Sequence, residues 1–83
     1  MYFHQKYCPF CVAANKYLAE LIAENPGYGR LEIEKIDENR EQARADRYDY
    51  WYVPTFYVDG IKLHEGALTK EKLRKVLDTA MEV

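Results

Sequence analysis

Residues 8–11 read Cys8-Pro9-Phe10-Cys11, and they lie at the junction between two predicted elements of different kinds. The short aromatic segment at residues 2–5 comes first and is typical of a strand. Pro9 then fits the first position of a helix, where its missing N–H group loses no hydrogen bond. We therefore expect Cys8 to cap a helix that begins shortly after the first strand.

A helix, a strand and a second helix follow from the residues after the cysteines. Apolar residues recur at helical spacing after Cys11, and Asn25-Pro26-Gly27 supplies a stop signal, which predicts a helix over residues 9–24. Residues 31–36 alternate apolar and charged side chains, a period typical of a strand with one buried face. Residues 37–49 are rich in Glu, Arg, Ala and Gln, which favour a second helix although its apolar stripe is thin.

The last third of the chain predicts a hairpin and a final helix. Residues 54–58 and 61–64 flank Asp59-Gly60, a dipeptide that favours the two-residue type I′ turn between antiparallel strands. Thr69 is suited to the N-cap of the last helix, and Glu71 complements the positive end of the helix dipole. The apolar stripe of this helix consists of Leu73, Val76, Leu77, Ala80 and Met81.

The predicted order of elements is β-α-β-α-β-β-α, which defines an α/β fold. A helical crossover makes the first two strands parallel, and the hairpin makes the last two antiparallel. The expected result is a four-stranded mixed sheet flanked by helices. We expect a single domain over residues 1–83, because so short a chain cannot enclose two independent cores.

Composition and charge exclude several classes of function. Hydrophobic residues make up 48% and charged residues 31% of the chain, which is typical of a folded globular protein. A formal charge of -2 provides no positive field for a phosphate backbone, so nucleic acid is not an expected partner. The sequence has no apolar run of about 18 residues and no room for a secretory leader before Cys8. We therefore expect a cytoplasmic protein without membrane association.

The spacing of the two cysteines predicts thiol–disulfide exchange. Cys8 and Cys11 are nearly one helical turn apart, so their side chains share a face and can form a disulfide. A helix N-terminus favours the thiolate that exchange requires, so Cys8 is the expected attacking sulfur. Cys11 lies one turn inside the helix and is expected to stay protonated until it resolves the mixed disulfide formed by Cys8.

A metal site is the alternative interpretation of this pair. A structural zinc site needs four ligands, whereas the sequence has no second cysteine pair, and only His4 and His64 could complete the set. The pair also joins a predicted strand to a predicted helix, as the redox motif does. Redox chemistry without a bound metal is therefore the favoured interpretation.

Two motifs together resemble the glutaredoxin family of the thioredoxin-fold superfamily. The resemblance rests on Cys8-Pro9-Phe10-Cys11 opening a helix and on Val53-Pro54-Thr55 entering the hairpin, and it covers essentially the whole chain. It implies a thioredoxin fold and an enzyme that reduces protein or glutathione mixed disulfides by a dithiol mechanism. No tightly bound cofactor is implied, and glutathione is a candidate co-substrate. The resemblance further implies that the bond before Pro54 is cis and that Val53 offers its backbone to an extended substrate.

The resemblance also leaves a second function open, because some glutaredoxins carry iron–sulfur clusters. In that alternative, Cys8 from two subunits and two added thiols hold a cluster in a dimer. The favoured interpretation is instead a monomer that acts on disulfide-containing proteins.

Two positions depart from the glutaredoxin pattern. Gln5 stands where the family commonly has a Lys or Arg that meets a glutathione carboxylate. Glu65-Gly66-Ala67-Leu68 lacks the second glycine and the aspartate that hold the other end of glutathione, and its Gly-Ala pair looks as much like thioredoxin. The electron donor is therefore either glutathione or a thioredoxin-type reductase, and we expect weak use of glutathione.

Aromatic side chains near the cysteines are candidate substrate contacts. Tyr7 and Phe10 flank the pair and are expected to shield it, and Tyr52 lies just before Val53 and Pro54. The run Tyr50-Trp51-Tyr52 could form an aromatic wall for a peptide or a small thiol. In the alternative, one of these rings packs inward and the others cover the edge of the sheet.

Overall fold

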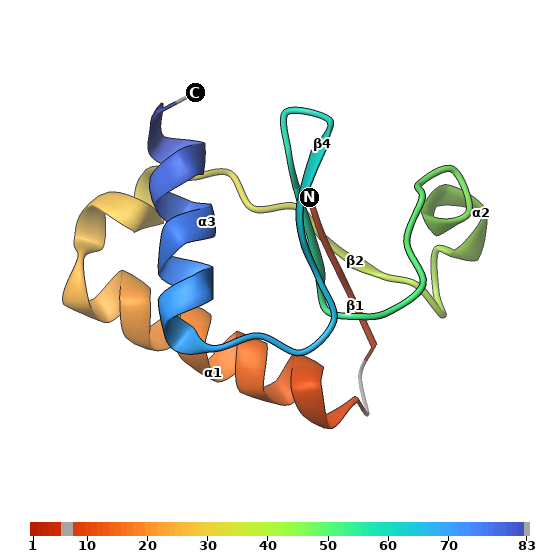
Figure 1. Cartoon of the computed structure of the whole chain (residues 1–83), viewed down its shortest axis with the longest axis horizontal. Helices are drawn as coiled ribbons and strands as arrows, with labels where there is room; N and C mark the ends of the chain where they lie inside the picture. The colour runs from red at the N-terminus through yellow and green to blue at the C-terminus, as the bar shows by residue number, and fades with distance from the viewer. Residues whose placement is uncertain (6–7, 83) are drawn as a thin grey trace.

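Figure 1 shows the chain as a sheet with helices packed beside it. The computed structural model describes residues 1–5 and 8–82. Within these residues the elements are β1 (Tyr2–His4), α1 (Pro9–Glu24), the 3₁₀ helix η1 (Pro26–Arg30), β2 (Lys35–Asp37), α2 (Gln42–Ala45), β3 (Thr55–Val58), β4 (Ile61–Glu65) and α3 (Lys70–Glu82). Apart from η1, this order agrees with the sequence prediction.

β1 is a central strand of the sheet. Within the described residues the sheet has four strands in the order β2-β1-β3-β4. β1 pairs in parallel with β2, with Tyr2 opposite Lys35, and antiparallel with β3, with Tyr2 opposite Phe56. β3 and β4 form an antiparallel hairpin. This topology confirms the expected mixed sheet of a thioredoxin fold.

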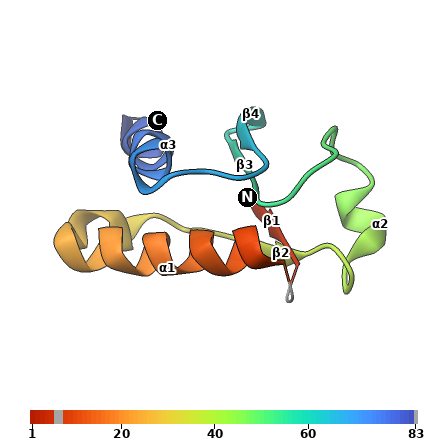
Figure 2. The same cartoon turned by 60° about the horizontal axis from the view of Figure 1, so that its bottom comes forward.

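Consecutive residues of β1 supply two hydrophobic cores, because side chains alternate between the faces of a sheet. The ring of Tyr2 stacks on Phe56, with 4.4 Å between their centroids, in the core formed with α1 and α3. Phe3 is buried in a second core with Ile36 and Ala45. Figure 2 shows the corresponding layers, with α1 and α3 on one side of the strands and α2 on the other.

Three of the eight tyrosines pack around Phe3 on the α2 side. The ring centroids of Tyr48, Tyr50 and Tyr57 lie 4.9, 4.8 and 5.8 Å from that of Phe3. Aromatic rings bury much apolar surface per residue. They therefore fill this core beside an α2 of only four residues.

The helix that carries the cysteines has the predicted bounds. α1 begins with Pro9 at its first position and ends before Asn25, its C-cap. Its buried face consists of Cys11, Ala14, Leu18 and Leu21, which recur every three or four residues. Within residues 1–5 and 8–82, no helix has the length and apolar character needed to cross a membrane.

The second strand differs from its prediction. We expected a strand over residues 31–36, whereas β2 covers Lys35–Asp37. β1 begins at Tyr2, opposite Lys35, and the N–H of Tyr2 donates to the carbonyl oxygen of Glu34 at 2.8 Å, so the ladder ends at this point. Leu31 and Ile33 still pack against the core, which accounts for the alternating pattern.

The second helix is shorter than predicted. Residues 37–49 were expected to be helical, whereas α2 covers only Gln42–Ala45. The side-chain carboxylate of Asp37 accepts the N–H of Asn39 at 3.0 Å. The backbone carbonyl oxygen of Asp37 accepts the N–H groups of Arg40 and Glu41. Such local bonds favour a turn over a helix. Ala45 is the one buried residue of α2, so its apolar face is too small to support a longer helix.

The hairpin turn has the predicted geometry. Asp59 and Gly60 have φ angles of 54° and 82°, and Val58 pairs with Ile61 across the two-residue loop. Positive φ at both central positions is the property of a type I′ turn. β4 runs one residue further than expected, to Glu65, and β1 ends one residue earlier, at His4.

The last helix begins at its predicted cap. The Oγ1 atom of Thr69 accepts the N–H of Lys72 at 3.2 Å. α3 buries Leu73, Val76 and Leu77. Contrary to the prediction, Met81 is 45% exposed. Its methyl group lies near Gly27, where only hydrogen stands in place of a side chain, so the end of the stripe has little apolar surface to pack against.

Replacing Gly60 by alanine should destabilise the protein by about 1 kcal/mol, because an L side chain is strained at positive φ. No atom lies within 4 Å of the added Cβ, so the cost comes from the backbone alone. Gly29→Ala is the matched control, since its Cβ meets only Ile22 at 3.8 Å. Urea unfolding of both variants measures the difference, and equal changes would contradict the turn assignment.

Candidate active site

The cysteine pair lies where the chain leaves the central strand and enters α1. Cys8 occupies the N-cap with an extended backbone (φ −78°, ψ 119°), and its carbonyl oxygen accepts the N–H of Val12 at 3.0 Å. The side chain of Cys8 makes no capping hydrogen bond to the helix. The predicted place of Cys8 at the cap is confirmed, but its sulfur lies beside the helix N-terminus without being bonded to it.

The thiol of Cys8 faces the loop before β3. Its Sγ atom lies 3.9 Å from the carbonyl oxygen of Val53, a distance at which a thiol can donate a weak hydrogen bond. Cys8 is half-buried. The contact joins residues 45 positions apart in the chain, so the tertiary fold assembles this part of the site.

The Val53–Pro54 peptide bond is cis, as the family resemblance implies. Pro54 is fully buried, whereas Val53 is half-buried with its carbonyl oxygen toward Cys8. The carbonyl oxygen of Pro54 accepts the N–H of Gly66 at 2.9 Å, which joins this loop to the end of β4. The two sequence motifs are therefore neighbours in space.

Cys11 lies beneath the surface. It is fully buried, and its Sγ atom accepts the backbone N–H of Gln5 at 3.4 Å. Burial raises the pKa of the Cys11 thiol to about 12, and the adjacent Cys8 thiol acts in the same direction. Both cysteines are free thiols in this structure. Cys11 is therefore protonated near neutral pH, in agreement with the expectation from the sequence.

Gln5 connects the cysteine site to a polar network behind it. The side-chain amide of Gln5 donates to the carboxylate of Glu38, which also accepts the hydroxyl of Tyr50 at 2.8 Å. Burial, together with this hydrogen bond, raises the pKa of Tyr50 above its ordinary value. The position at which glutaredoxins commonly carry a cation is thus occupied by an amide bonded to a carboxylate.

The aromatic residues near the site divide into two groups. Tyr50 is half-buried and stacks on Phe3, whereas Trp51 and Tyr52 are 86% and 70% exposed. Phe10, between the two cysteines, is 56% exposed. One ring of the run at 50–52 therefore packs inward, and the other two face solvent. The predicted contact residue Tyr7 lies outside the described residues.

Glu65 has a structural role that no sequence pattern predicted. Its carboxylate accepts the backbone N–H groups of Trp51 and Tyr52 at 2.5 and 3.0 Å and the ammonium group of Lys62 at 2.7 Å. The bond from Lys62, followed by that from Trp51, lowers the pKa of Glu65 to about 2. Lys62 lies in the same strand as Glu65, but the two backbone donors, Trp51 and Tyr52, are 13–14 positions away, so no local pattern indicates these contacts.

The alternative interpretation of the cysteine pair, a metal site, needs further ligands close to the two sulfurs. Within residues 1–5 and 8–82, no three or more His, Cys, Asp or Glu side chains are grouped so that they could hold a metal ion. The Nε2 atom of His64 instead lies 3.0 and 3.1 Å from the carbonyl oxygens of Gly66 and Ala67. The His64 imidazole therefore contacts backbone carbonyl groups at the end of the hairpin.

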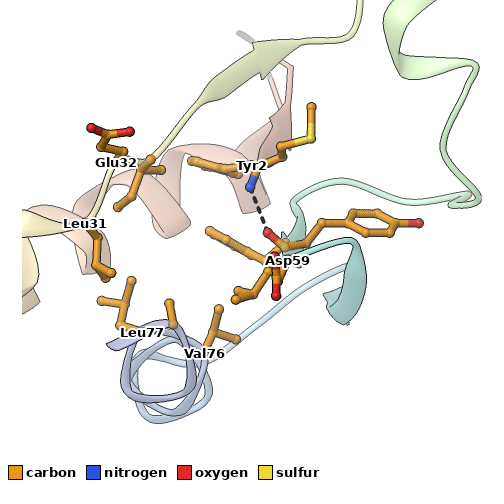
Figure 3. Close-up of a pocket in the computed structure, with 12 residues that line it drawn as sticks. Tyr2, Leu31, Glu32, Asp59, Val76 and Leu77 are labelled. Carbon is orange, nitrogen blue, oxygen red and sulfur yellow. Dashed lines mark hydrogen bonds between the residues drawn. The ribbon is translucent and has the colours of Figure 1, made fainter. Parts of the chain in front are cut away.

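An apolar cavity of about 230 Å³ opens at the other end of β1 and β3 (Figure 3). Its wall includes Leu31, Ile33, Phe56, Val76 and Leu77. No cysteine lines it. Cys8 instead follows the end of β1 and faces Val53 at the start of β3, so the cavity and the thiol site are separate.

The fold and the paired thiols place the chain among the dithiol proteins of the thioredoxin-fold superfamily. The chain belongs to the thioredoxin domain family, whose model matches residues 3–78. The match covers Cys8, Cys11 and Pro54. It confirms the superfamily that the sequence predicted, and the narrower glutaredoxin assignment stays a prediction.

Two proteins named as thioredoxins are similar to the chain over most of their lengths. A probable thioredoxin of Methanothermobacter thermautotrophicus is 29% identical over 76 residues, which are 90% of this chain and 86% of the relative. A thioredoxin of Methanocaldococcus jannaschii is 35% identical over 66 residues, or 80% of this chain and 75% of the relative. No solved structure gives a significant match.

Alkylation of the reduced native protein near neutral pH should label Cys8 much faster than Cys11. Cys8 is half-buried, whereas Cys11 is fully buried and its thiol has a pKa of about 12. Little of Cys11 is therefore present as the thiolate that reacts with the alkylating agent. Peptide mapping after a short iodoacetamide pulse measures both rates. The unfolded protein serves as the control, in which both thiols should react alike. Faster labelling of Cys11 in the native state would reverse the assignment.

Proposed function

We propose that the chain is a thiol–disulfide oxidoreductase that reduces disulfides in proteins by a dithiol mechanism. The observation that carries the proposal is the difference between the two thiols. Cys8 is partly accessible and faces the Val53 carbonyl oxygen, whereas Cys11 is buried directly behind it with a raised pKa. Membership of the thioredoxin domain family supports the same activity.

The first step of the proposed reaction belongs to Cys8. Its thiolate attacks one sulfur of a substrate disulfide and forms a mixed disulfide, and the other substrate sulfur leaves as a thiolate that takes up a proton. Cys8 is half-buried, whereas Cys11 is fully buried, so Cys8 is the sulfur that a substrate disulfide can reach. The position of Cys8 at the N-cap therefore suits it to this role.

The second step belongs to Cys11. Its thiol loses a proton and the sulfur attacks Cys8, which releases the second substrate thiol and leaves a disulfide between residues 8 and 11. Two electrons have then passed from the protein to the substrate. A buried thiol with a raised pKa is a poor first attacker but lies within reach of Cys8 when the mixed disulfide forms.

Residues around Cys8 are the proposed contacts for the substrate. An extended segment of the substrate would pair with the backbone of Val53, and Pro54 shapes the surface behind it. Phe10 lies between the two cysteines in the sequence and Tyr52 comes directly before Val53, and both side chains are largely exposed. Tyr7 belongs to the proposed contact set through its sequence position next to Cys8.

The proposed electron donor is a thioredoxin-type reductase in preference to glutathione. A glutathione carboxylate would meet Gln5, whose amide is already bonded to the negative Glu38. At its other end glutathione would approach Glu65, which offers no positive charge and already holds Lys62 and the N–H groups of Trp51 and Tyr52. No tightly bound cofactor is needed for this dithiol chemistry, and we propose a cytoplasmic monomer.

Serine variants of the two cysteines test the mechanism. Cys11→Ser should accumulate a mixed disulfide with a disulfide-linked protein such as insulin, because Cys8 can begin the exchange but nothing resolves it. Cys8→Ser should abolish turnover. Non-reducing gel electrophoresis detects the trapped species, and turbidity of reduced insulin follows turnover. Turnover by the Cys8 variant would show the mechanism to be wrong.

A visible absorption spectrum of the purified wild-type protein tests the alternative function. Absorption from an iron–sulfur cluster would support a cluster carrier instead of a disulfide reductase.

Rates with glutathione as the sole donor should be at least about tenfold below those with a thioredoxin reductase and NADPH. Each charge-assisted contact that is missing at Gln5 and at Leu68 costs about 1.5–3 kcal/mol of binding, and about 1.4 kcal/mol corresponds to a factor of ten. Steady-state insulin reduction with each donor measures the ratio. Saturation at low glutathione, with no turnover from the reductase, would restore the glutaredoxin assignment.

A further inference from the structure

We propose that Glu65 is a positioning residue that holds the segment at residues 51–53 in the conformation that receives a polypeptide substrate. The inference rests on the proposed function and adds to it a residue that controls substrate recognition. Glu65 is the last residue of β4, and neither cysteine is near it in the sequence.

The carboxylate of Glu65 accepts hydrogen bonds from the loop before β3 and from its own strand, β4. Its Oε2 atom accepts the successive backbone N–H groups of Trp51 and Tyr52, and its Oε1 atom accepts the ammonium group of Lys62. Hydrogen bonds to an ionised acceptor are about twice as strong as neutral ones. Lys62 also contacts the carbonyl oxygen of Asp49 at 3.2 Å, so the ion pair and the loop form one unit.

Other side chains of the hairpin complete the attachment of the loop. The hydroxyl of Thr55 donates to the carbonyl oxygen of Tyr52, and the hydroxyl of Tyr57 donates to that of Asp49 at 2.7 Å. These bonds satisfy carbonyl groups, whereas Glu65 satisfies the N–H groups of the same loop. Residues 49–53 lie outside helices and strands, so these contacts take the place of regular backbone pairing.

The segment held by Glu65 carries the surface that a substrate would meet. Trp51 and Tyr52 expose 86% and 70% of their surface, and the next residue is Val53, whose carbonyl oxygen faces Cys8 at 3.9 Å. A loop fixed before binding loses less entropy when a partner docks on it. The carboxylate thus acts on recognition of a large substrate and does not touch the sulfur that reacts.

The test compares a large and a small disulfide with the same variants. Glu65→Ala should raise KM for insulin about five- to tenfold with little change in kcat, because two backbone N–H groups lose their charged acceptor. The reaction with a small symmetric disulfide, 2-hydroxyethyl disulfide, should keep its wild-type rate, since it needs Cys8 but little of the loop. Circular dichroism and thermal unfolding establish that each variant is folded.

Three further variants make the comparison specific. Glu65→Gln keeps an oxygen that can accept the two N–H groups, so it should recover most of the KM lost in Glu65→Ala. Lys62→Met removes the ion pair but leaves the carboxylate on the loop, and it should change KM less than about twofold. Glu34→Ala is the matched control, because Glu34 pairs with Arg44 of α2 and belongs to neither the loop nor the hairpin.

The outcomes separate this inference from the proposed function. A wild-type protein that reduces neither insulin nor the small disulfide would overturn the proposed function itself. An active wild type with an unchanged KM in Glu65→Ala would overturn the role of Glu65 alone. An equal loss with both disulfides would also overturn it, because the residue would then act on the chemistry of Cys8 and not on docking.

Discussion

The rest of the structure depends on the burial of β1 on both of its faces. Tyr2 and Phe3 are fully buried, and they enter opposite cores because side chains alternate along a strand. Loss of a buried aromatic ring typically costs about 3–5 kcal/mol, a large share of the stability of a small domain. A strand anchored in this way determines where the chain emerges from the sheet, and therefore where α1 and Cys8 begin.

The start of α1 gives the two cysteines different environments although they are three residues apart. Cys8 stands at the cap, half-buried and beside the Val53 carbonyl oxygen. Cys11 is one turn further along, on the face that packs against the sheet, where burial raises its pKa to about 12. The two sulfurs thus differ in how deeply they lie in the fold, and this difference supports the proposed order of attack. The backbone N–H of Gln5, just after β1, donates to the buried sulfur at 3.4 Å.

The loop opposite the cysteines owes its order to the hairpin behind it. Residues 49–53 form no helix or strand, and side chains of β3 and β4 satisfy their backbone groups. Such a loop can expose large rings at Trp51 and Tyr52 without losing its conformation. Exposed rings next to Val53 in the chain suit the proposed contact with a polypeptide, since rings provide much contact area for little lost entropy.

Local signals in the sequence determined α1, the turn at Asp59-Gly60, the cap of α3 and the cysteine pair, because each depends on residues close together in the chain. The extents of β2 and α2 were wrong, because the length of a strand depends on its partner and the length of a helix on the face that it can bury. The tertiary structure alone decided that Cys8 meets Val53, that Cys11 is sealed behind it and that Glu65 holds the loop. Cys8 and Val53 are 45 positions apart in the chain, Gln5 and Cys11 are 6 apart, and Glu65 lies 13–14 positions from the N–H groups that it binds. No local periodicity in the sequence indicates which of these groups become neighbours.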